Sequence, residues 1–199
     1  VMGGYYRDVV AGGAMSRLEV ALWRPRRLKA SGRQRSKTMN MLAATVLIGA
    51  GATALIDLWA VARKQVFGVP LPNYGLVGRW LAHMPRGRFR HDSIASARPV
   101  QGERLLGWTA HYLIGISYAA ILPAIWGAGW IAHPTIGPAL LVGIGTVAAP
   151  FLLMQPGMGA GIAASRTPHP AAARFHSIVM HAVFGLGLYA SALALASAI

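Results

Sequence analysis

The chain has no cysteine among its 199 residues. Disulfides, thiolate metal ligands, covalent haem attachment and cysteine nucleophiles are therefore excluded as features of this chain. Any chemistry it performs must use other side chains.

Acidic residues are also scarce. Five Asp and Glu stand against 19 Lys and Arg, and charged residues make up 12% of a chain that is 55% hydrophobic. This is too apolar for an ordinary soluble domain and predicts a membrane protein. The formal charge of +14 alone would suggest nucleic acid or anionic lipid. Because the basic residues flank the apolar stretches and no nucleic-acid motif accompanies them, we expect the lipid bilayer and its anionic headgroups as partners, and no nucleic acid.

Four apolar stretches reach the roughly 20 residues that crossing a bilayer requires. They predict an all-α polytopic membrane protein, with spans at about residues 41–62, 107–131, 135–154 and 175–198. Only residues 132–134 separate the second span from the third, which predicts a tight turn between antiparallel helices. We therefore expect one four-helix transmembrane domain, 41–199, built as two helical hairpins.

Positive charge is spread unevenly over the connections. The loop 63–106 holds eight Lys and Arg and the loop 155–174 holds two, and the positive-inside rule places both in the cytoplasm. The segment 1–40 carries nine and contradicts this placement. Two alternatives stay open: a basic arm, largely disordered apart from a short helix near Met15–Trp23, or a start assigned too far upstream.

The loop 63–106 also contains a helical pattern. Four large apolar residues recur at helical spacing after Asn73: Val77, Trp80, Leu81 and Met84. They predict a short helix at the membrane interface, with Tyr74 and Trp80 as anchors at headgroup depth.

Three arginines follow that helix, Arg86, Arg88 and Arg90. This patch would bind an anionic lipid headgroup or an acidic partner; alternatively, it is only a topology signal.

Glycines and histidines recur in corresponding places. Spans one and three each carry two glycines one residue apart: Gly49 and Gly51, and Gly143 and Gly145. Spans two and four each place a histidine four residues before a glycine: His111 and Gly115, and His181 and Gly185. The pattern predicts a parallel internal repeat, with chance as the competing explanation. Small residues let helices approach closely in lipid, so six are expected at helix contacts: Gly49, Gly51, Gly143, Gly145, Gly185 and Gly187.

Four polar residues lie within or at the end of the spans: Asp57, His111, Gln155 and His181. An ionised Asp at the centre of a span costs about 2.5–3.5 kcal/mol, so Asp57 is either paired with Arg63, Arg79 or a histidine, or is part of a proton or cation site. The histidines are either packing groups or titrating members of the same cluster. Gln155 precedes Pro156, where we expect a helix terminator or a hinge. No metal-ligand spacing is present, and no metal or cofactor is expected.

Several short motifs together resemble a known family. They are Asp57-Leu-Trp59, Asn73-Tyr74 with Gly78-Arg79-Trp80, the run Gly87 to Asp92, Gly107-Trp108 with His111-Tyr112, and Gln155-Pro156-Gly157-Met158-Gly159. The combination resembles bacterial membrane proteins grouped as domain-of-unknown-function family 2938, over about residues 41–198. The resemblance implies a four-span bacterial inner-membrane protein of uncharacterised activity and supplies no mechanism.

Three kinds of function remain open. The favoured one is a non-enzymatic membrane protein, expected as a homo-oligomer, that moves or senses a small solute or a proton through the polar cluster. The second is a membrane enzyme that uses Asp57, His111 and His181 as acid–base groups on an anionic lipid held by Arg86, Arg88 and Arg90. The third is a structural or assembly protein that needs only the glycines.

Overall fold

The computed structural model describes residues 27–198, and the side chains of residues 41–198. The chain divides into two compact units, residues 1–39 and 40–199. The expectations for residues 1–26, including the short helix near Met15–Trp23, lie outside the described residues. All four apolar helices belong to the second unit.

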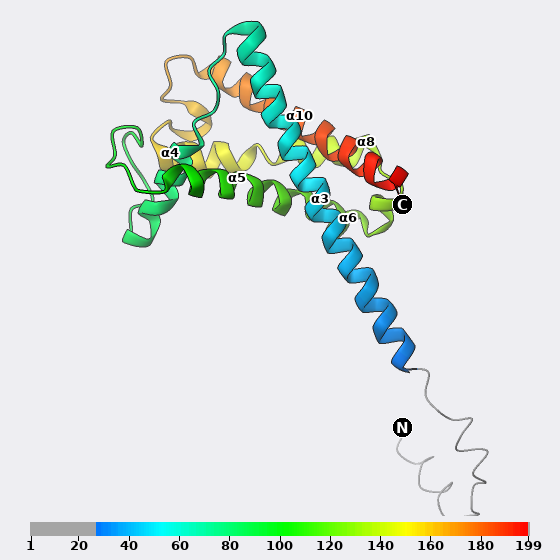
Figure 1. Ribbon diagram of the computed structural model, residues 1–199. Helices are drawn as coiled ribbons and strands as arrows, with labels where there is room; N and C mark the ends of the chain where they lie inside the picture. The colour runs from blue at the N-terminus through cyan, green and yellow to red at the C-terminus, as the bar shows by residue number, and fades with distance from the viewer. Residues whose placement is uncertain (1–26, 199) are drawn as a thin grey trace, which may run out of the picture. The chain divides into compact units, whose positions relative to one another are not determined.

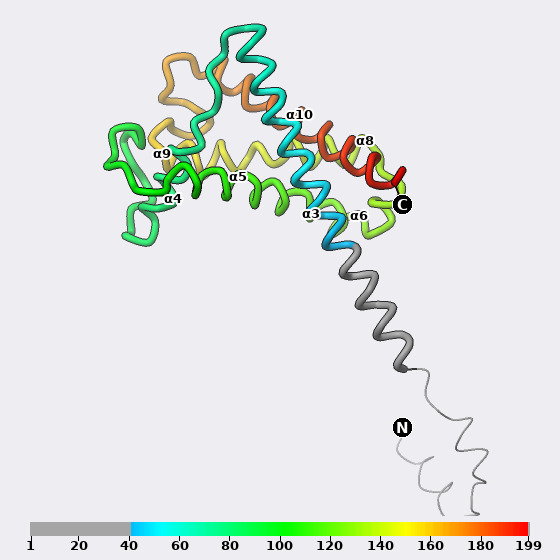
Figure 2. The backbone as a smooth tube through the Cα atoms, in the orientation of Figure 1, coloured from blue at the N-terminus to red at the C-terminus, as the bar shows by residue number. Residues whose placement is uncertain are grey.

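The described part of the chain is helical and contains no strand. The longer helices are α3 (Arg27–Phe67), α4 (Tyr74–His83), α5 (Glu103–Ala119), α8 (Ile136–Gly145) and α10 (Pro170–Ala198) (Figure 1). The shorter ones are α6 (Ile121–Trp126), α7 (Gly129–Ala132), a π-helical turn η2 (Pro150–Met154), α9 (Gln155–Met158) and the 3₁₀ turns η1 (Met84–Arg86) and η3 (Ile162–Ala164). Figure 2 traces the path of the backbone.

Four helical segments are long and apolar enough to cross a membrane, as predicted. They are Met41–Phe67, Glu103–Trp126, Ile136–Met158 and Pro170–Ala198, of 27, 24, 23 and 29 residues. Large apolar side chains cover their outer faces; Leu141 is 65% exposed, for example. Such a surface is stable in lipid and not in water. The all-α prediction is confirmed, and the chain is a multi-pass membrane protein.

The second span is displaced toward the N-terminus from its predicted position at 107–131. It begins at Glu103 because the charge of this residue is satisfied by Arg79, whose Nε and Nη2 donate to the carboxylate at 2.8 and 2.7 Å. It ends at Trp126 because Gly127 has a φ of 76°, a conformation that only glycine adopts readily.

The third span runs four residues beyond its predicted end at Met154. The helix does not stop at Pro156, the predicted terminator, but continues to Met158. The helix is irregular earlier, in the π turn that begins at Pro150. It ends at Met158, followed by Gly159 with a φ of 99°.

Glycines bring the spans into backbone contact. A Cβ on Gly49 of α3 would lie 2.5 Å from Ile116 Cα of α5, and one on Gly187 of α10 would lie 3.0 Å from Ala52 Cα of α3. Both distances are too short for a side chain, so these positions must be glycine if the helices are to pack this closely.

The α8 and α10 helices meet in the same way. A Cβ on Gly143 would lie 2.5 Å from the backbone nitrogen of Gly185 and 2.8 Å from His181 O. The expectation for Gly145 was wrong, since nothing lies within 4 Å of the Cβ it would carry. It is two residues further along α8, about 200° around the helix, and therefore on a different face.

The short helix predicted after Asn73 is α4. Asn73 caps it, its side-chain oxygen accepting from Gly75 N at 3.1 Å. The helix packs across α5, with Gly78 and Gly107 at the contact. The hydroxyl of Tyr74, the first residue of α4, donates to Asp57 of the first span.

Arg79 organises the connection between α4 and α5. Besides its two bonds to Glu103, its Nη1 donates to three backbone carbonyls of the connection: Ile94 at 3.3 Å, Ala95 at 3.1 Å and Ala97 at 3.1 Å. A planar guanidinium with five donors suits this role. The loop is therefore held in one shape.

Candidate functional site

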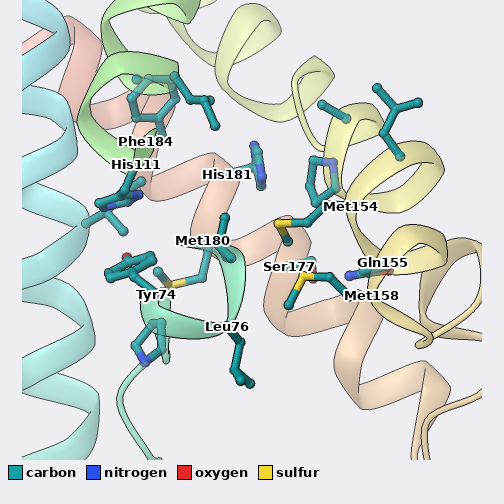
Figure 3. Close-up of a pocket in the computed structure, with 18 of the residues that line it drawn as sticks. Tyr74, Leu76, His111, Met154, Gln155, Met158, Ser177, Met180, His181 and Phe184 are labelled. Atoms are coloured by element: carbon teal, nitrogen blue, oxygen red, sulfur yellow. The ribbon is translucent and has the colours of Figure 1, made fainter. Parts of the chain in front are cut away.

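A hollow of about 750 Å³ lies between the spans (Figure 3). Its wall combines residues of α3, α4, α5, the η2–α9 segment and α10. Most are apolar, including Ile56, Leu76, Ile114, Leu153, Met154, Met158, Met180 and Phe184. Three thioethers make part of this wall soft and adaptable. The polar groups among them are few, which is typical of a pocket for an organic molecule.

A carboxylate with three hydrogen-bond donors lies beside the pocket. Oδ1 of Asp57 accepts from the Tyr74 hydroxyl at 3.2 Å and lies 3.1 Å from His111 Nε2. Oδ2 accepts from the Tyr112 hydroxyl at 3.1 Å. The side chains of His111 and Asp57 are only 17% and 20% exposed. Three helices, α3, α4 and α5, thus contribute to one buried polar cluster.

Aromatic stacking fixes the position of the imidazole. The ring of Tyr74 stacks on that of His111 with centroids 4.0 Å apart, and Trp108 meets both edge-on. Burial and then the Asp57 carboxylate raise the pKa of the Tyr74 hydroxyl above its usual value. Tyr74 therefore stays protonated and donates to Asp57.

His181 belongs to the opposite wall. Its Nδ1 lies 3.1 Å from the carbonyl oxygen of Gly143, and the Thr146 hydroxyl donates to that same oxygen at 2.7 Å. Nδ1 also lies 3.1 Å from the Thr146 hydroxyl oxygen, so its role as donor or acceptor depends on the tautomer of the ring. The His181 side chain lines the pocket.

Gln155 lines the pocket from α9 (Figure 3). Its Oε1 is buried and has no hydrogen-bond partner among the described residues. A buried amide oxygen of this kind costs free energy unless something else donates to it. A polar group of a bound molecule would meet that need.

The family model described as "Protein of unknown function (DUF2938)" matches residues 46–195. The chain belongs to this family. No curated protein and no solved structure matches it.

The matched DUF2938 region contains every residue of the predicted cluster. The structure joins Asp57 directly to His111, and it places His111, Gln155 and His181 around the one pocket. Gln155 and His181 make no bond to the Asp57–His111 pair. Whether the four act as one functional site stays a prediction.

Neither suggested arginine partner of Asp57 fills that role in this DUF2938 chain. Arg79 is engaged by Glu103, and Nη1 of Arg63 lies 3.5 Å from His176 Nδ1. The actual partners include Tyr112, which sequence reasoning missed. Its position directly after His111 was the available signal.

The three arginines predicted to contact headgroups separate in this DUF2938 structure. Arg88 and Arg90 line a second hollow of about 510 Å³, whereas Arg86 does not. Arg86 is exposed, and its Nη1 donates to Ala82 O at 3.5 Å.

Proposed function

We propose that the protein binds a small amphipathic organic solute in the 750 Å³ pocket and moves or senses it, with a proton exchanged at the Asp57–His111 pair. The observation that carries this proposal is the hydrogen-bonded carboxylate–imidazole pair at the wall of a largely apolar pocket.

The pocket supports an amphipathic solute. Its apolar wall would cover a hydrocarbon or aromatic body, while the polar groups of His111, Gln155 and His181 would orient one polar end. Ile114 and Leu153 line the pocket and are 43% and 67% exposed, so this apolar wall is open and accessible to a solute.

The polar cluster supports proton exchange. An ionisable residue within a span is costly to insert and points to an ion or proton pathway. Histidine is the side chain that ordinarily titrates between pH 5 and 8. If His111 took up a proton, the imidazolium would be paired with the Asp57 carboxylate, and the charge at the pocket wall would change.

For topology, we propose an inner-membrane protein of a bacterium with the loops 63–106 and 155–174 in the cytoplasm. Two backbone bonds support a common side for these loops: His91 N donates to Gly157 O at 2.9 Å, and Ile94 N donates to Met158 O at 3.0 Å. An even number of spans between them requires this. The homo-oligomer stays a prediction.

The enzyme alternative has less support. It needs the acid–base groups and the headgroup-binding arginines in one site, but His111 and Arg88 line different hollows.

A thiol-labelling experiment tests the pocket, since the chain has no native cysteine. Ser177 lines the pocket, whereas Ser117 is exposed on the outside of the second span. In vesicles, we expect a membrane-impermeant maleimide to label Ser177→Cys and not Ser117→Cys, because thiolate forms only where water reaches. Amphipathic solutes that occupy the site should slow labelling at position 177, which also provides a screen for the ligand.

Equal protection of the two cysteines in a folded protein would contradict a water-accessible pocket. In that case the buried polar groups serve helix packing alone.

A further inference from the structure

The second hollow, of about 510 Å³, differs in character from the first. Its wall is mainly polar and basic: Arg88, Arg90, His91, Asp92, Ser93, Ser96, Ala97, Pro156 and Arg166. We infer that it is a binding site for a phosphate-bearing anion, held by the guanidinium groups of Arg88, Arg90 and Arg166. This inference does not depend on the proposed function of the first pocket.

The charge of the wall calls for an anion. Three arginines line one hollow, and Asp92 is the acidic residue among them. In the part of the chain that the structure describes, none of the three arginines makes a salt bridge. Like charges around one hollow repel each other, and a bound anion would convert that repulsion into attraction.

Other polar side chains accompany the arginines. Both ring nitrogens of His91 are buried and lack a hydrogen-bond partner among the described residues. Ser93 contributes a hydroxyl to the wall, while the hydroxyl of Ser96 donates to Ser93 O at 3.0 Å. A phosphate group has several acceptor oxygens, and arginine forks match their geometry better than lysine does. The donor set thus suits a phosphate better than a small halide.

The wall is held by backbone bonds and is not a loose surface patch. The segment with Arg88 and Arg90 is joined to the end of α9 by the bond from His91 N to Gly157 O, 2.9 Å long. Arg166 N donates to Ala160 O at 2.8 Å, just beyond the same helix. Gly159 permits this approach, because a Cβ there would collide with Asp92 O. Two chain segments far apart in sequence therefore present their arginines to one hollow.

Sequence proximity alone would have selected a different set. Arg86 lies two residues before Arg88 but is absent from the wall, and Arg166 from a distant loop takes its place. Arg86 is therefore a control of identical charge on the same loop.

The phosphate could belong to a lipid headgroup or to a soluble phosphate ester, and one experiment separates them. The purified full chain in neutral detergent is titrated with inorganic phosphate, or with phosphatidylglycerol in the micelle, at constant ionic strength set by chloride. Thermal unfolding is followed for the wild type and for Arg88→Ala, Arg90→Ala, Arg166→Ala and Arg86→Ala. Unfolding in chloride alone shows whether each variant is folded.

We expect the ligand to stabilise the wild type and Arg86→Ala equally. Loss of any one of the three wall arginines should weaken the apparent affinity about tenfold or more, the usual effect of losing a charge-assisted hydrogen bond. Stabilisation by inorganic phosphate and not by phosphatidylglycerol identifies a soluble phosphate ester as the ligand class, stabilisation by phosphatidylglycerol alone identifies a headgroup, and stabilisation by both identifies the phosphate group itself as what the site recognises. Arg86→Ala and Arg166→Ala losing affinity equally, or no stabilisation by either ligand, would overturn the inference.

Discussion

Replacing Gly143 by alanine is expected to lower the free energy of unfolding by about 3 kcal/mol, the upper part of the range for overpacking a tight contact. The added Cβ would lie 2.5 Å from Gly185 N and 2.8 Å from His181 O, both backbone atoms that cannot rotate away. The helices α8 and α10 must separate, and the bond of His181 to Gly143 O lengthens with them. Denaturant unfolding in detergent, followed by helical signal, measures the change.

The matched control is Gly145→Ala on the same helix. Nothing lies within 4 Å of the new Cβ, so stability should be unchanged or rise by up to about 1 kcal/mol from helix propensity. Equal destabilisation by the two substitutions would mean that α8 responds to a change in glycine content and not to its contact with α10.

Asp57→Asn and His111→Gln are each expected to slow proton movement coupled to the solute by at least about tenfold. Neither amide exchanges a proton near neutral pH, and both are close in size to the original side chain. Asn keeps one acceptor oxygen, so one of the two tyrosine hydroxyls must turn to accept from the amide NH2, and the free energy of unfolding should fall by about 1–2 kcal/mol. The measurement uses vesicles with an internal pH indicator and a solute that protects Ser177→Cys from labelling.

The double variant distinguishes a working pair from two independent residues. If Asp57 and His111 act together, the double variant loses no more than either single variant. His133→Gln, in the turn after α7, serves as the histidine control and should leave proton movement intact. Solute-coupled proton movement in Asp57→Asn at the wild-type rate would rule out a proton role for the pair.

The sequence was sufficient for the spans and for the family. Apolar length alone identifies a spanning helix, and this signal is local, so the four spans and α4 were predicted within a few residues. At one bound that moved, a distant partner was responsible. The second span begins early at Glu103 because Arg79, from a separate helix, neutralises it.

The sequence identified residues of the site but not the contacts between them. Asp57 and His111 were identified because polar residues are costly in lipid, but the bond between them depends on how α3 and α5 cross. The contribution of Tyr74 follows from the crossing of α4 over α5, which no local pattern encodes. Arg166 could not be linked to Arg88 for the same reason, since the backbone pairing of their loops is a tertiary contact.

The π turn at Pro150–Met154 has a mechanical consequence. In this turn the backbone N–H of Gln155 donates to Pro150 O, five residues earlier. In an α-helix it would donate to the carbonyl oxygen four residues earlier. Converting this π turn into regular α-helix would rotate the following helix α9 by about 100° about its axis. Gln155 and Met158 would then leave the apolar pocket, and Pro156 would leave the arginine-lined hollow, in a single register step. A change of register in this one turn would therefore alter the walls of both hollows at once.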